Sequence, residues 1–157
     1  MKMLIAVDGS AASLDAVRHA IALANEGLRA RLLLANVQEP THLYEMVLAR
    51  DLDLIERAAE GAGAHALQDA VALVRAAGLE FETEIATGEP AHTLVEVAEN
   101  FGCGMIVVGA RGAGSLRSAM LGSVSTELLH SASMPVLVVK AAEAPAEAEA
   151  EAEVEAD

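Results

Sequence analysis

A glycine-rich connection is the segment of this sequence whose residue types and spacing are best suited to chemistry. It begins with Gly109, Arg111 and Gly112, directly after the apolar run 105–108, and it ends at Gly122. Between a strand and a helix, such a loop can turn backbone N–H groups toward an anion, and the amino end of the helix adds partial positive charge. Glycine suits the loop because it lacks the Cβ that would keep phosphate oxygens away from the backbone amides, and because it tolerates a positive φ. The connection therefore predicts a phosphate site.

The residues that follow Gly122 add donors to the same place. Ser123, Val124 and Ser125 stand at the expected start of a helix over residues 124–131, so two hydroxyl groups join the backbone amides there. The spacing differs from a Walker A loop, which ends in Gly-Lys-Ser/Thr, and from the dinucleotide fingerprint, which opens on the first strand. Two alternatives stay open: the connection is a flexible loop without a ligand, and Arg111 is solvated instead of paired with phosphate.

Asp8 and Gly9 come directly after the first predicted strand, residues 3–7. In an open parallel sheet, ligands bind in the crevice beyond the carboxyl ends of the strands. If this strand neighbours the strand at 105–108, Asp8 and Gly109 face the same crevice. The alternative is that Asp8 caps the N–H groups of the helix that follows it, and the two roles are compatible.

The elements that must position these residues alternate along the chain. Ser10 is the expected N-cap of the first helix, and Gly61 and Gly63 are expected to split the long second helix or to loosen its middle. Alternating strands and helices predict βαβ units and a parallel sheet, and nearly all-apolar strands indicate helices on both faces. Strands are predicted at residues 3–7, 31–37, 79–85, 105–108 and 136–139, and helices at 11–26, 44–77, 90–101 and 124–131.

Composition restricts the class of function. The chain has 157 residues, which suits one domain, and its formal net charge is −14. Seven acidic side chains and no basic one lie in residues 141–157, a Glu/Ala-rich run expected to be a disordered, solvated tail. The negative charge and an aromatic content of 2% argue against nucleic-acid binding. Without a visible secretory signal or a membrane-spanning apolar stretch, we expect a cytoplasmic protein with no membrane partner.

Taken together, these motifs resemble the universal stress protein family, in its ATP-binding branch. The similarity covers residues 1–140 and leaves the acidic tail outside. It is carried by Val7-Asp8-Gly9-Ser10, by Gly88-Glu89-Pro90, by Gly109-x2-Gly112-x9-Gly122-Ser123 and by Met134-Pro135-Val136.

The resemblance implies one Rossmann-like α/β domain: an open five-stranded parallel sheet of order 3-2-1-4-5 with helices on both faces. It also implies ATP as the ligand, with Mg²⁺ on the phosphates. Adenine would lie near the main chain of Val37, and Asp8 and Gly9 would lie beside the nucleoside. The phosphates would be held by Gly109, Arg111, Gly112, Gly122, Ser123, Val124 and Ser125.

The resemblance further implies a homodimer through the last strand, Val136, Leu137, Val138 and Val139, an edge that needs cover. We expect a nucleotide-responsive module in a stress response, with an unidentified regulatory partner. The alternatives are a slow or partner-activated ATPase and an adaptor dimer that binds no nucleotide. No residue is nominated as catalytic or as a metal ligand, because no histidine stands at ligand spacing and no Gly-x-Ser-x-Gly elbow is present.

Overall fold

The structure is a computed structural model that describes residues 1–40, 52–111 and 120–141. Strands lie where the sequence predicts them, with ends that differ by at most two residues, and the predicted helical residues 44–51 lie outside the described part. The elements are β1 Lys2–Ala6, α1 Ala11–Asn25, β2 Arg31–Gln38, α3 Leu52–Ala76, β3 Phe81–Thr87, α4 Pro90–Asn100, β4 Met105–Gly109, α5 Ser123–Ser131 and β5 Val136–Val139.

The strands form one five-stranded sheet in the order β3-β2-β1-β4-β5, which confirms the predicted α/β fold and strand order. Every pairing between neighbours is parallel, so all carboxyl ends lie at the same edge. In the central strand, Leu4 pairs with Leu33 of β2 and with Ile106 of β4. Residues after β1 and residues after β4 therefore leave the sheet side by side.

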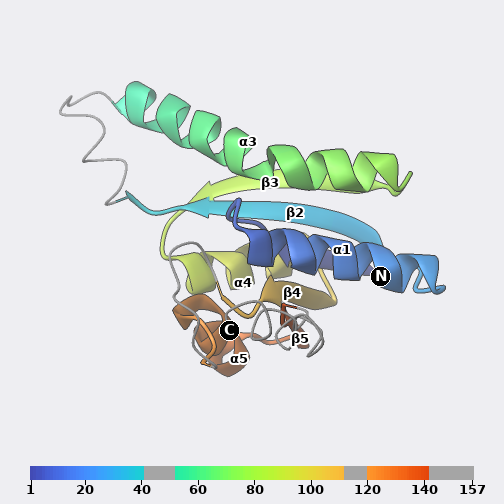
Figure 1. The fold of residues 1–157 in the computed structure, drawn as a ribbon. Coiled ribbons are helices and arrows are strands. Elements are labelled where there is room, and N and C mark those ends of the chain that lie inside the picture. Colours follow the sequence, from blue (N-terminus) through green and yellow to red (C-terminus); the bar gives the residue numbers. More distant parts are fainter. Residues whose placement is uncertain (41–51, 112–119, 142–157) are drawn as a thin grey trace, which may run out of the picture.

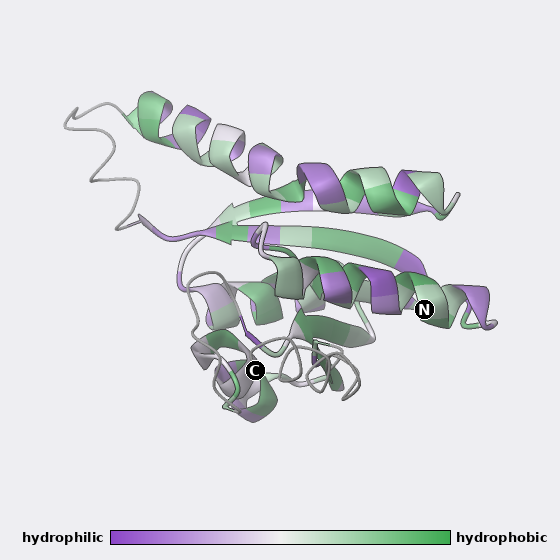
Figure 2. Ribbon diagram, in the orientation of Figure 1, coloured by the Kyte–Doolittle hydropathy of each residue, from purple (hydrophilic) through white to green (hydrophobic). Residues whose placement is uncertain are grey.

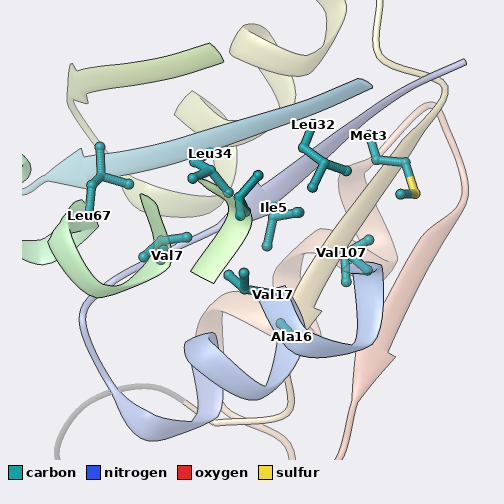
Figure 3. Close-up of a cluster of buried hydrophobic side chains, with 12 residues drawn as sticks. Met3, Ile5, Val7, Ala16, Val17, Leu32, Leu34, Leu67 and Val107 are labelled. Carbon is teal, nitrogen blue, oxygen red and sulfur yellow. The ribbon is translucent and has the colours of Figure 1, made fainter. Parts of the chain in front are cut away.

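Helices cover both faces of the sheet (Figure 1). On one face, Met3 and Ile5 of β1 pack with buried side chains of α1 and α3 (Figure 3). On the other face, Leu4 packs with buried side chains of α4 and with Leu128 of α5. Alternate β1 residues thus enter opposite cores, which explains why this strand is apolar on both sides. The neighbouring strand β2 is likewise hydrophobic along most of its length (Figure 2).

Capping residues fix where two helices begin. Ser10 is the N-cap of α1, as predicted, and its hydroxyl oxygen accepts a hydrogen bond from Ser13 N at 3.2 Å. Pro90 is the first residue of α4, and the Glu89 carboxylate before it accepts hydrogen bonds from two backbone amides of the first turn. Because α1 follows β1 directly, its capped amino end lies at the carboxyl edge of the sheet.

The long helix α3 is continuous through Gly61 and Gly63, so the first alternative, that these glycines split it, is wrong, and the second, that they loosen its middle, stays a prediction. The reason for Gly63 is a tertiary contact: a Cβ placed there would lie 2.5 Å from Cγ2 of Ile85 in β3. Gly63 therefore lets α3 approach the edge of the sheet closely. A Cβ at Gly61 would meet nothing within 4 Å.

The two glycines should respond oppositely to the same substitution. Gly61→Ala is expected to stabilise the protein by about 0.5–1 kcal/mol, because alanine favours a helix interior. Gly63→Ala should destabilise it by about 1–3 kcal/mol through overpacking against Ile85, despite the same gain in propensity. Urea denaturation of both variants measures this. In the Ile85→Ala background, Gly63→Ala should lose most of its cost; an undiminished cost there would contradict the proposed contact.

Candidate functional site

The carboxyl edge of β1 and β4 gathers most of the residues that the sequence nominates. β1 and β4 are neighbours, with Ile5 paired to Val107, so the chain after each strand emerges at the same edge. The turn at Asp8 and Gly9 lies on one side, and Gly109 ends the other strand. This confirms the adjacency on which the predicted common crevice depended.

The turn after β1 is held by its own hydrogen bonds. Asp8 is exposed, and its Oδ1 accepts a hydrogen bond from Ser10 N at 2.8 Å, so the carboxylate shapes the turn that leads into the cap of α1. Gly9 has a φ of 83°, which favours glycine, and a Cβ there would lie 3.5 Å from Cα of Ala66 in α3. The turn therefore lies close to the backbone of α3.

Gly109 is required by a close approach of α1. A Cβ at this position would lie 2.7 Å from the carbonyl oxygen of Ala12 and 2.9 Å from its carbonyl carbon. The φ of Gly109 is not positive, so its conformation alone does not demand glycine. The packing of the first turn of α1 supplies a reason for this glycine that sequence reasoning, directed at phosphate, did not give.

The start of α5 is tied to the end of β4. Gly122 is the N-cap of α5, with φ −66° and ψ 165°, and its N–H donates to the Ala110 carbonyl at 2.7 Å. Ala110 N in turn donates to the Val139 carbonyl at 2.8 Å, which links β4 to β5. No side chain caps α5, so the amides of residues 123–125 point out of the helix end without a side-chain acceptor from the described part of the chain.

The two serines at this helix end differ in their surroundings. Ser123 is exposed, whereas Ser125 is buried and its Oγ lies 3.1 Å from the Ala110 carbonyl and 3.0 Å from the Gly122 carbonyl. The Ser125 hydroxyl therefore fastens the helix start to β4, and the Ser123 hydroxyl lies at the surface. Val124 is half-buried and packs against the α4-side core.

The remaining nominated residues lie around this edge. Val37 is half-buried on the α4 side near the end of β2 and pairs with Ala86. Arg111 is half-buried directly after Ala110, and Gly112 lies outside the described residues, as does the acidic run from residue 142 onward. The described part of this edge thus brings together Asp8, Gly9, Gly109, Arg111 and the start of α5.

Sequence reasoning missed Asn36 and Gln38 of β2. Asn36 is buried, and its Nδ2 donates to the Val7 carbonyl at 2.8 Å, while Gln38 Nε2 donates to Asn36 Oδ1 at 2.7 Å. The available signal was the position of Asn36 inside an otherwise apolar strand, because a buried amide must find hydrogen-bond partners.

Other chemistry is not evident in the described residues. Among them no group of three or more His, Cys, Asp or Glu side chains is arranged to hold a metal ion. Burial raises the pKa of the Cys103 thiol, with smaller influences from Lys2 and Glu82, and this thiol precedes β4 at the opposite edge of the sheet. The helices of the described ranges include none that could cross a membrane. The arrangement is therefore suited to holding an anion through backbone amides.

Comparisons with known proteins find relatives over most of the chain. Residues 1–140 match the model of the universal stress protein family. The universal stress protein YxiE of Bacillus subtilis is 35% identical over 146 residues, covering 88% of this chain and 98% of YxiE. The universal stress protein MJ0531 of Methanocaldococcus jannaschii is 33% identical over 139 residues, covering 88% of this chain and 81% of MJ0531.

Solved structures share the fold. That of MJ0577 of Methanocaldococcus jannaschii superposes with a TM-score of 0.76 at 25% identity, covering 91% of this chain and 97% of the other. A universal stress protein in complex with cAMP superposes with a TM-score of 0.63 at 26% identity, covering 89% of this chain and 96% of the other.

Proposed function

Since the chain belongs to the universal stress protein family, we propose that it binds ATP at the carboxyl edge of β1 and β4 and acts as a nucleotide-responsive regulatory module. The observation that carries the proposal is the start of α5, which no side chain of the described residues caps, and which the parallel pairing of β1 with β4 places beside the turn at Asp8 and Gly9. The cAMP complex of a similar protein supports an adenine nucleotide as the ligand class.

Each nominated residue has a place in this proposal. Backbone amides at Gly122, Ser123, Val124 and Ser125 hold phosphate oxygens, because a helix end carries partial positive charge and unsatisfied N–H groups. Gly109, Arg111 and Gly112 complete the phosphate side. Asp8 and Gly9 lie beside the nucleoside, and the main chain at Val37 meets the adenine.

Magnesium is proposed to bind together with ATP, on its phosphate groups. The described side of the site offers backbone amides and the Arg111 guanidinium, which leaves most of the charge of a triphosphate without a cationic side chain. Mg²⁺ keeps several waters and is usually held largely through substrate phosphates, so it is proposed to bind on the phosphates without a dedicated protein ligand. Bound there, the ion would supply charge neutralisation.

The last strand is proposed to form the interface of a homodimer. β5 is an edge strand of the sheet, and all four of its residues are half-buried. An edge of this kind presents unpaired N–H and C=O groups that a second copy can pair with. A cytoplasmic location and a regulatory partner protein stay predictions of the sequence.

Mass spectrometry of the denatured, purified protein tests the ligand first, because co-purified adenine nucleotide would identify it without a choice of probe. Titration calorimetry with Mg-ATP, and with Mg-GTP as the matched nucleotide, then measures affinity and base preference. We expect bound adenine nucleotide and a clear preference for Mg-ATP. Protein free of nucleotide that gives no heat with either triphosphate would instead favour the adaptor dimer.

Phosphate release separates binding from the ATPase alternative. Efficient phosphoryl transfer needs a positioned water or base and charge clamps, and only Asp8 and Arg111 are candidates for these roles at the described edge. We expect no turnover above the background of Mg-ATP alone. Steady release by the wild-type protein that is lost in Asp8→Asn would establish an enzyme.

The acidic run at residues 141–157 should weaken nucleotide binding. The Val139 carbonyl accepts a hydrogen bond from Ala110, so β5 ends next to the proposed phosphate site, and the sequence that follows it carries seven acidic side chains. A variant ending at Lys140 is expected to bind Mg-ATP roughly two- to fivefold more tightly at 50 mM salt, with the gain disappearing near 0.5 M salt. Calorimetry at both salt concentrations measures this; a gain independent of salt would contradict an electrostatic origin.

A further inference from the structure

We propose that Asn36 is a positioning residue of the nucleotide site, which acts by holding the turn at Asp8 and Gly9; the inference rests on the proposed function. Asn36 lies near the carboxyl end of β2, is 3% exposed, and donates from Nδ2 to the Val7 carbonyl at 2.8 Å. Val7 immediately precedes Asp8. The Asn36 side chain of β2 therefore forms a hydrogen bond with the residue directly before the turn that follows β1.

The orientation of the Asn36 amide follows from its two partners. The Val7 carbonyl can only accept a hydrogen bond, so the Asn36 NH₂ group must face it. Asn36 Oδ1 is then left as an acceptor, and Gln38 Nε2 donates to it at 2.7 Å. Both ends of the buried amide are satisfied in this one arrangement, and its flipped form would set two acceptors against each other.

The position of this bond is what gives it control over the turn. The backbone pairing of β1 with β2 ends where Val7 N donates to the Ala35 carbonyl at 2.8 Å. The Val7 carbonyl then accepts its hydrogen bond from the side chain of Asn36 instead of from the β2 backbone. The peptide bond between Val7 and Asp8 is planar, so fixing the carbonyl also fixes the direction of the Asp8 N–H.

Asp8 N donates a hydrogen bond to Ser13 Oγ at 3.4 Å, and Asp8 Oδ1 accepts one from Ser10 N at 2.8 Å. If the whole peptide plane between Val7 and Asp8 changed its orientation, both hydrogen bonds would be disturbed. The Asp8 carboxylate, which is proposed to lie beside the nucleoside, would then move. Asn36 thus acts on the ligand through the turn and needs no contact of its own with it.

Asn36→Leu tests the proposal, because leucine has a similar size and removes both hydrogen bonds. Two readouts are needed: the ¹⁵N–¹H signal and hydrogen exchange of the Ser10 amide without nucleotide, and the Kd for Mg-ATP. We expect a displaced Ser10 signal, at least about tenfold faster exchange and about tenfold weaker binding. Gln38→Leu keeps the bond to Val7 and should change the Kd by less than about threefold.

Val97→Ala is the control for a purely structural role, because Val97 is buried in α4 on the other face of the sheet. It should lower the melting temperature while leaving the Ser10 signal and the Kd unchanged. If Asn36→Leu does not fold, Asn36→Ser replaces it with the same expected readouts.

The outcomes separate the two proposals. An unchanged Ser10 signal in the Asn36 variant overturns the positioning role, whatever the wild-type protein binds. A displaced Ser10 signal with wild-type affinity also overturns it, because the turn would then not matter to the ligand. Absence of Mg-ATP binding by the wild-type protein contradicts the proposed function, and the Ser10 readout still reports whether Asn36 orders the turn.

Discussion

Gly109→Ala is expected to lower the free energy of unfolding by about 2–3 kcal/mol. The added methyl group would lie 2.7 Å from the Ala12 carbonyl oxygen, and backbone atoms at the first turn of α1 cannot rotate away from it. Either α1 shifts from the sheet or β4 moves, and both changes disturb the edge that holds Asp8. Urea denaturation followed by circular dichroism measures the loss, and the same variant should bind Mg-ATP more weakly.

Gly104→Ala is the matched control at the other end of β4. There the new methyl group would meet only Cε of Met1 at 3.2 Å, the flexible end of an exposed side chain, so we expect a change within about 0.5 kcal/mol. Ala12→Gly should not rescue Gly109→Ala, because the two closest atoms belong to the backbone. Equal stabilities of the two glycine variants would contradict the close approach of α1.

Gly122→Asp should greatly weaken nucleotide binding while leaving the fold intact. Gly122 has a φ of −66°, which any residue adopts, and it occupies the N-cap, where aspartate is among the preferred residues. Its carboxylate would accept from the amides of α5 that are proposed to hold phosphate, and its charge would repel the triphosphate. A repulsion of about 1.4–2.7 kcal/mol between neighbouring charges weakens binding by roughly ten- to a hundredfold.

Gly122→Asn separates the cap from the charge. Asparagine offers a similar acceptor to the same amides without a negative charge, so we expect an intermediate loss of affinity. Both variants should melt within a few degrees of the wild-type protein, since glycine and the capping residues differ by only a few tenths of a kcal/mol at an N-cap. Calorimetry with Mg-ATP gives the affinities. Unchanged affinity in Gly122→Asp would remove the start of α5 from the phosphate site.

The strand order, and with it the adjacency of β1 and β4 at the candidate site, could be predicted because the signals are local or belong to the family. Apolar runs bounded by glycine, proline and a capping serine mark each element within its own segment. The expected neighbourhood of β1 and β4 then places Asp8 and Gly109 at one edge. These inferences need no knowledge of which side chains touch across the fold.

The features that sequence reasoning missed are contacts between distant residues. Gly63 does not interrupt α3; the absence of a side chain there leaves room for Ile85 of β3. The close approach of α1 requires glycine at position 109, with or without a ligand. The bond from Asn36 to Val7 spans 29 residues of sequence. A sequence pattern shows that a residue is unusual for its element, but only the packed structure shows what it touches.

Nuclear magnetic resonance titration of ¹⁵N-labelled protein with Mg-ATP tests most directly whether the carboxyl edge of β1 and β4 binds the nucleotide. We predict the largest amide shifts at Asp8, Gly9 and Ala110 and at the start of α5. Arg29 and Arg31, beside a shallow hollow at the opposite edge of the sheet, should stay unchanged. Shifts confined to that opposite edge, or no shifts at saturating Mg-ATP, would contradict the site.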